Sequence, residues 1–142
     1  MSTSFSTSFN LGSQKIVAFV ATRDPAAAKR FYQETLGLRL IGEDRFATMF
    51  DVNGTMLRVT HVPDWTPPRF TVFGWEVTDI VTAVTELGKA GVRFERYMPD
   101  QDELNIWTSP SGPGVDPAHG GARVAWFKDP DGNVLSVTAL PV

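Results

Sequence analysis

Few side chains in this sequence have types that support chemistry. Cysteine is absent, which excludes disulfides, zinc ribbons, iron–sulfur clusters and thiol nucleophiles. His61 and His119 are the only histidines, and with Glu76 they could form a two-histidine metal site. A structural or solvated role for both is the stronger interpretation, because His61 falls among helix-facing positions and His119 lies in a long loop. The sequence has no P-loop, dinucleotide-binding glycine pattern or nucleophile elbow.

Arg58 and Glu76 are the charged side chains that could act on a ligand. A guanidinium in the middle of a strand can bind a carboxylate or phosphate through two hydrogen bonds, although a surface arginine or an internal pair with Glu76 is the slightly stronger interpretation. Glu76 could serve as a general base if burial raised its pKa. Trp107 and Trp126 offer rings that stack on a planar or cationic ligand, although a tryptophan more often belongs to the core.

Length and charge limit the class of protein. The chain has 142 residues, of which 42% are hydrophobic, so it can bury the core of one compact domain or of two small modules. The net charge of −3, without a Lys or Arg cluster, argues against nucleic acid and anionic membranes as partners. No apolar run is long enough to span a membrane. The lack of cysteine fits a reducing compartment, and we expect a cytoplasmic protein.

The chain contains one pattern twice, and this pattern positions the candidate residues. Apolar runs at 16–20 and 70–77 predict strands. Each run is followed by a helix with an aspartate N-cap, Asp24 in the first copy and Asp79 in the second. Glycines at equivalent places, Gly37 and Gly91, end the two helices.

The later parts of the two copies also match. Residues 51–60 align with 129–138, with Asp, Gly, Leu, Val and Thr in the same places. Each copy therefore reads as a βαβββ module with its helix on one side of a four-stranded sheet. We predict an α+β fold of two tandem βαβββ modules that form curved mixed sheets around a cavity.

The repeat also predicts where the modules begin and end. Extra residues in the second copy indicate an insertion that contains Trp107, for which a binding loop and a plain floppy connector are equally supported. The expected segments are a frayed tail (1–10), a first module (11–62), a Pro-rich linker (63–69) and a second module (70–142) with the insertion at about 98–121.

Strand alternation assigns residues to two faces of each sheet. Apolar positions such as Leu57 and Leu135 belong under the helices. The other face, here called the open face, is neither cleanly polar nor cleanly apolar, which suits a small-molecule cavity. The open face carries Val17, Phe19, Ala21, Met56, Arg58 and Thr60 in the first module and Val72, Gly74, Glu76, Val134, Ser136 and Thr138 in the second.

The motifs RDP (23–25), FY (31–32), LGL (36–38) and FKDPDGN (127–133), together with the tandem repeat, resemble the vicinal oxygen chelate superfamily. This is the glyoxalase, bleomycin-resistance and extradiol-dioxygenase group. The resemblance implies metal ligands, usually His, Gln or Glu, at one point in the opening strand and one in the last strand of each module. Those four positions are Val17, Arg58, Val72 and Ser136, none of which is a good ligand for a divalent cation.

We therefore expect a metal-free protein without a cofactor that binds a small, partly aromatic organic ligand. The alternative is a divergent lyase, isomerase or dioxygenase-type enzyme that uses Glu76 or His61 as base and Arg58 as electrostatic stabiliser. A third interpretation is a fold kept only for structure or association. The resemblance implies a homodimer, and the identity of the ligand does not follow from the sequence. The candidate ligand-binding residues are Phe19, Arg58, Glu76, Trp107, Trp126 and Ser136.

Overall fold

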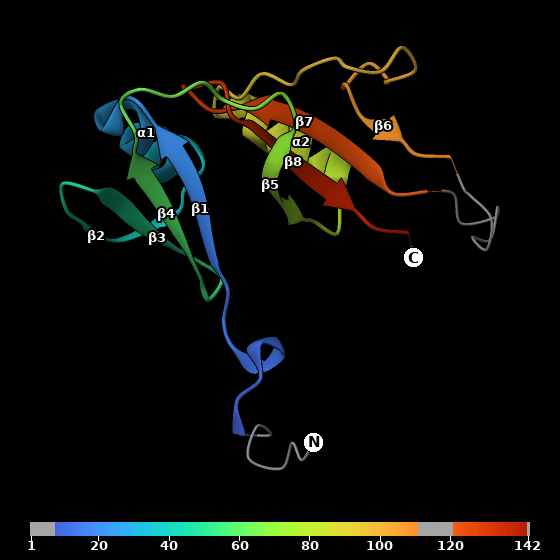
Figure 1. Ribbon diagram of the computed structural model, residues 1–142. Helices are drawn as coiled ribbons and strands as arrows, with labels where there is room; N and C mark the ends of the chain where they lie inside the picture. The colour runs from blue at the N-terminus through green and yellow to red at the C-terminus, as the bar shows by residue number, and fades with distance from the viewer. Residues whose placement is uncertain (1–7, 111–120, 142) are drawn as a thin grey trace.

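The computed structural model describes residues 8–110 and 121–141, which form two mixed sheets with a helix on one side of each (Figure 1). The strands are β1 (Val17–Thr22), β2 (Arg39–Glu43), β3 (Ala47–Val52), β4 (Thr55–His61), β5 (Thr71–Glu76), β6 (Trp107–Thr108), β7 (Arg123–Lys128) and β8 (Val134–Ala139). Sheet A has the order β1-β4-β3-β2, and sheet B repeats it as β5-β8-β7-β6. The α+β class and the tandem arrangement predicted from the repeat are confirmed.

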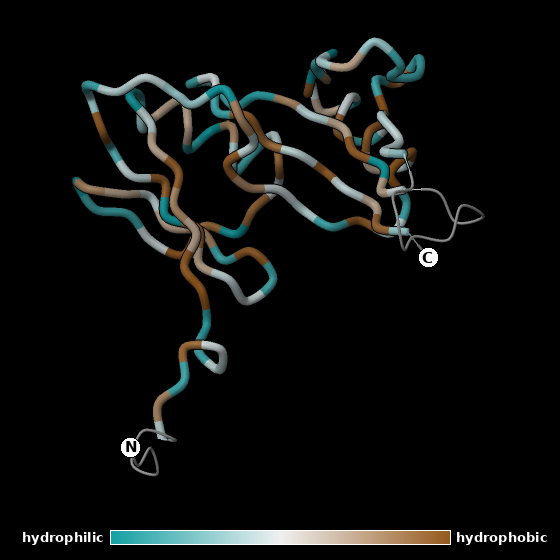
Figure 2. The backbone as a smooth tube through the Cα atoms, turned by 45° about the vertical axis from the view of Figure 1, so that its right-hand side comes forward, coloured by the Kyte–Doolittle hydropathy of each residue, from teal (hydrophilic) through white to brown (hydrophobic). Residues whose placement is uncertain are grey.

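Part of the sequence-based prediction lies outside the described residues. This applies to 1–7 of the expected tail, to 111–120 of the expected insertion and to His119. Ahead of β1, a short 3-10 helix, η2 (Leu11–Ser13), belongs to a segment that leads away from both sheets (Figure 2). No helix in the described part of the chain is long and apolar enough to cross a membrane.

The helices begin where the aspartate caps predict. In the first module, α1 (Pro25–Arg30) starts after Asp24, whose carboxylate accepts from the Ala27 backbone N–H at 3.2 Å. It continues as a π-helical turn, η3 (Phe31–Thr35), before Gly37 reverses the chain at φ 75°. In the second module, α2 (Ile80–Lys89) starts in the same way after Asp79.

The predicted alternation of faces is confirmed in sheet A but only in part in sheet B, where Val134 and Ser136 of the predicted open face are buried and a register shift at the start of β5 lets Val72 pack against the core. Leu57 is 1% exposed, whereas its neighbour on the other face, Arg58, is half-buried. Arg58 pairs across the parallel β1–β4 ladder with Phe19, which is 61% exposed. In sheet B the helix-facing Phe73 and Trp75 pack against the core.

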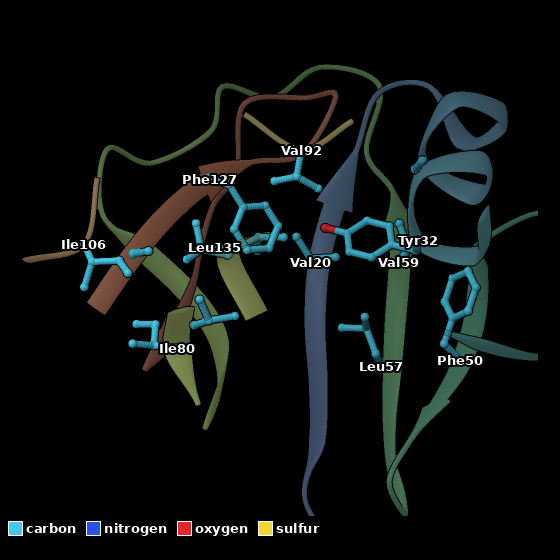
Figure 3. Close-up of a cluster of buried hydrophobic side chains, with 14 residues drawn as sticks. Val20, Tyr32, Phe50, Leu57, Val59, Ile80, Val92, Ile106, Phe127 and Leu135 are labelled. Carbon is cyan, nitrogen blue, oxygen red and sulfur yellow. The ribbon is translucent and has the colours of Figure 1, made fainter. Parts of the chain in front are cut away.

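The helix-facing sides of the two sheets share one hydrophobic core. Phe127 and Leu135 of sheet B lie with Val20 and Val59 of sheet A in the space between the sheets (Figure 3). Tyr32 of η3 stacks on the ring of Phe73 with centroids 6.5 Å apart. Because both helix-facing sides are used in this contact, the two open faces point outward.

A buried polar cluster, here called the Asp129 cluster, joins the modules at one end of this core. The Asp129 carboxylate accepts from the Tyr32 hydroxyl at 2.7 Å, from the Asn133 amide at 2.7 Å and from the backbone N–H groups of Asp131 and Asn133, both at 2.9 Å. Asn133 also donates to the Ala21 carbonyl of β1 at 2.9 Å, and the Arg23 backbone N–H donates to Asp131 at 2.8 Å. The turn at residues 129–133 of the second module is thus hydrogen-bonded directly to the first strand and the helix of the first module.

Burial raises the pKa values of two groups in this cluster, Tyr32 and Asp129. Desolvation, followed by the charge and hydrogen bond of Asp129, raises the pKa of Tyr32 well above its ordinary value of 10.0. Desolvation also raises the pKa of Asp129, although its hydrogen bonds from Asn133 and Tyr32 oppose the shift. Tyr32 therefore stabilises the fold fully below pH 10, and this stabilisation is lost as pH rises above 10 and the unfolded chain ionises.

Replacement of Tyr32 by Phe tests the role of this cluster. We expect Tyr32→Phe to lower the free energy of unfolding by about 1–3 kcal/mol at pH 7, because a buried carboxylate loses a hydrogen bond. The difference from wild type should narrow above pH 10, since only the wild type carries the Tyr32 ionisation. Urea unfolding at pH 7 and pH 10.5 measures both effects. Tyr97→Phe, at a half-exposed tyrosine, is the control for the loss of stability at pH 7, and a Tyr32→Phe gap that does not change with pH would contradict the assignment.

Candidate functional site

The open face of sheet A presents one cation next to apolar side chains. Arg58 lies in the middle of β4, and its Nη1 atom is 3.3 Å from the sulfur of Met49 on β3. Phe19 flanks it on β1. Among the described residues, no carboxylate forms an ion pair with Arg58. Backbone hydrogen bonds from Phe46 and Ala47, together with the nearby charge of Arg58, lower the pKa of Asp44. A half-buried guanidinium without an ion pair can still bind an anion.

The open face of sheet B presents three aromatic rings. Trp126 of β7 lies between Trp107, at a centroid distance of 6.1 Å, and Tyr97, at 5.7 Å. Ser136 pairs with Trp126 across β7 and β8 but is only 8% exposed. The Ser136 hydroxyl fills the space next to Gly74, where an added Cβ would collide with it. The aromatic rings, rather than the serine hydroxyl, thus form the accessible surface.

The loop between α2 and β6 holds these rings in place through Gln101. This side chain is 4% exposed, and its Oε1 atom accepts from the backbone N–H groups of Tyr97 and Met98 at 2.6 and 2.7 Å. Its Nε2 atom donates to the carbonyls of Glu95 and Asn105 at 3.0 and 2.6 Å. With all four hydrogen-bonding positions of the amide in use, the loop has a defined shape.

Arg96 and Trp107 make further hydrogen bonds that stabilise the same loop at its surface. Arg96 donates to the Gln101 carbonyl at 2.8 Å and to the Asn105 side chain at 3.0 Å. Trp107 donates from Nε1 to Asp100 at 3.0 Å, which fixes the plane of its ring. The loop therefore presents its aromatic side chains in a preorganised arrangement.

A groove, here called the β5–β8 groove, runs beside this aromatic wall at the start of β5 and β8. It consists of two adjoining clefts of about 270 and 480 Å³ that share Arg69, Tyr97 and Val134. Val134 is buried and lies between the aromatic wall and the first residues of β5. Burial, followed by the charge of Glu95, raises the pKa of Tyr97, so this ring stays neutral at physiological pH.

Five of the six candidate residues fall into two groups rather than one, and the sixth, Glu76, belongs to neither. Phe19 and Arg58 belong to the open face of sheet A, whereas Trp107, Trp126 and Ser136 belong to sheet B. Since the helix-facing sides form the shared core, a single chain does not bring the two groups together. The sequence-based expectation of one cavity shared by both open faces therefore does not hold within one chain.

Glu76 and His61 are not placed beside Arg58 either. Glu76 is exposed at the end of β5 and lines two clefts between the modules, of about 210 and 490 Å³, together with the helix-facing Trp75. His61 is three residues from Arg58 on β4, so the two side chains leave opposite faces of the sheet. One chain thus does not assemble a base and a guanidinium from these residues.

The positions that correspond to metal ligands do not fit a divalent cation. Val17 and Val72 offer no donor atom, and Arg58 carries a positive charge that repels a cation. Ser136 offers a single neutral hydroxyl and is buried. Among the described residues, no cluster of three or more His, Asp or Glu side chains could hold a metal ion.

Three residues of the site were missed by the sequence analysis. Tyr97 and Arg69 lie just outside the strands that the repeat defines, so strand alternation does not reach them. Gln101 has no local signal, since its role depends on a loop whose path no periodicity predicts. The proximity of Tyr97 to the predicted insertion was the one available indication.

Comparison with known proteins agrees with this fold. The profile of the Glyoxalase/Bleomycin resistance protein/Dioxygenase superfamily matches residues 15–137. The search of curated proteins finds no match. Similar solved structures include a glyoxalase/bleomycin resistance protein/dioxygenase from Alicyclobacillus acidocaldarius, with 16% identity, a TM-score of 0.66 and coverage of 93% of this chain and 95% of that chain.

Two other solved structures have the same fold. A lactoylglutathione lyase from Agrobacterium tumefaciens is 14% identical, with a TM-score of 0.60 and coverage of 89% of this chain and 93% of that chain. A glyoxalase/bleomycin resistance protein/dioxygenase from Nocardioides is 21% identical, with a TM-score of 0.61 and coverage of 97% and 91%. At these identities the likeness concerns the fold alone. With the profile match over most of its length, the chain belongs to the glyoxalase/bleomycin resistance protein/dioxygenase superfamily.

Proposed function

We propose that this protein binds a small, partly aromatic organic molecule without a metal ion. The observation that carries the proposal is Arg58, a half-buried guanidinium where metal-dependent relatives are expected to place a ligand atom. A cation at that point can bind the anionic group of a ligand directly. The adjacent Phe19 and Met49 supply apolar surface for the remainder of the molecule.

We also propose that two copies associate along their free strand edges. β1 and β5 are edge strands of their sheets. Exposed apolar side chains gather on or just before them, at Ile16, Val17, Phe19 and Phe70. Such surface is a liability in a monomer and favours pairing with a second chain. With the edges joined, the open face of sheet B in one copy would lie beside the open face of sheet A in the other. The two groups of candidate residues would then form one site.

Loss of the Arg58 charge tests the proposed site. A thermal-shift screen with small aromatic acids, amides and amines should find compounds that stabilise the wild type. We expect Arg58→Ala to weaken an anionic compound found in this way by about tenfold or more, because a charge-assisted hydrogen bond is lost. Arg30→Ala, on α1 beneath the other face of sheet A, should leave the affinity unchanged.

Metal removal separates this function from the enzymatic alternative. Chelator-treated protein should bind the same compounds with unchanged affinity, and elemental analysis should find less than stoichiometric Zn, Ni, Fe and Mn. Stoichiometric metal, or turnover that disappears in Glu76→Ala, would instead establish the enzyme. A broad panel without any stabilising compound would favour a purely structural role.

The proposed dimer predicts a specific response to a charge on β1. Sedimentation should give about twice the chain mass of 15.6 kDa for the wild type. Phe19→Asp should weaken association by roughly thirtyfold or more, because an apolar contact at an interface centre is replaced by a charge. Phe46→Asp is the matched control, since Phe46 is 59% exposed but lies between β2 and β3 at the far side of sheet A. A monomeric wild type at working concentration would disprove the dimer.

A further inference from the structure

The β5–β8 groove has a rigid aromatic wall with an accessible surface. Tyr97 is 47% exposed, and Trp126 of β7 is half-buried. Gln101 fixes the loop that carries Tyr97, through the hydrogen bonds described above. Half-exposed rings held at fixed positions lose little conformational entropy when a flat ligand stacks on them.

The remaining sides of the groove leave room for a ring. Val134 lies at its base, and Phe70 and Thr71 line the side opposite the aromatic wall. The linker prolines Pro67 and Pro68 line the adjoining cleft. Pro67 packs closely on the turn at Gly132, since its Cγ atom is 3.3 Å from the place where a Cβ on that glycine would lie. These rigid, mostly apolar sides favour a planar apolar body over a flexible polar chain.

The charges around the groove are mainly positive. Arg69 is exposed and lines both of its clefts, and no carboxylate among the described residues pairs with it. Lys128 lines the second cleft and has Glu95 at 3.9 Å, which offsets part of its charge. Arg69 is thus the principal cation, and a ligand with a negative group beside its ring is favoured.

We propose that the β5–β8 groove binds a planar aromatic ring that carries a carboxylate. The ring stacks beside Trp126 and Tyr97 over Val134, and the carboxylate accepts hydrogen bonds from Arg69. An organic ammonium of the same shape is repelled by the same arginine, although the rings alone would accept it. This inference rests on the proposed small-molecule function and names the class of its ligand.

Three probes of one shape separate charge from stacking. 2-Naphthoate, 2-naphthamide and 2-naphthylmethylammonium are titrated calorimetrically into wild type, Arg69→Gln and the control Arg30→Gln. We expect 2-naphthoate to bind most tightly to the wild type and Arg69→Gln to weaken it by about tenfold or more. The amide should bind both proteins equally, and Arg30→Gln should match the wild type. Equal thermal unfolding midpoints establish that the variants are folded.

A second readout locates the ring. In NMR spectra, 2-naphthoate should shift the indole N–H resonance of Trp126, assigned through Trp126→Phe, and leave that of the core residue Trp75 in place. Tyr97→Leu should weaken 2-naphthoate and 2-naphthamide alike, since it removes part of the wall and no charge.

The outcomes distinguish this inference from the proposed function. Equal affinity for naphthoate and naphthamide, or no effect of Arg69→Gln, overturns the groove assignment. If Arg58→Ala abolishes binding while Arg69→Gln does not, the ligand lies at sheet A, so the proposed function stands and this inference fails. If no compound of any class stabilises the protein, both fail.

Discussion

The carboxylate of Asp129 is buried between two modules, and the arrangement of the whole chain depends on how it is satisfied. A buried carboxylate without hydrogen-bond partners would destabilise the fold by more than the packing around it stabilises it. The two modules therefore pack where the Tyr32 hydroxyl can donate to Asp129. Apolar contacts are not directional, so the aromatic core alone does not fix how the two modules pack. The hydrogen bonds of Asp129, and that from Asn133 to β1, are directional and fix it. The polar cluster therefore selects the arrangement that the apolar core stabilises.

That arrangement decides where function can lie. With both helix-facing sides joined, each chain presents two outward surfaces of different chemistry. Sheet A offers Arg58 with apolar neighbours, whereas sheet B offers a wall of three rings and the cation Arg69. The two surfaces derive from the same repeated pattern but differ in chemistry. A site combined from both would therefore contact the two sides of a ligand differently.

Sequence alone predicted what local patterns determine. The caps Asp24 and Asp79 and the burial of Leu57 followed from short-range rules and are found as expected. The contact of Tyr32 with Asp129 could not be predicted, because 97 residues separate them and neither has a local signal for the other. The same holds for the candidate site, where alternation found Trp126 but not Tyr97.

The segment that breaks the repeat also supplies two of the three rings of the aromatic wall, Tyr97 and Trp107. Residues 95–107 leave α2, are held by Gln101 and return to pair Trp107 with Val124 of β7. Sheet A has no equivalent loop between α1 and β2, so its open face keeps an exposed Phe19 without such a wall. Ring recognition is therefore expected on the second module, because among the described residues it is there that a loop fixed by buried hydrogen bonds holds aromatic side chains over the sheet.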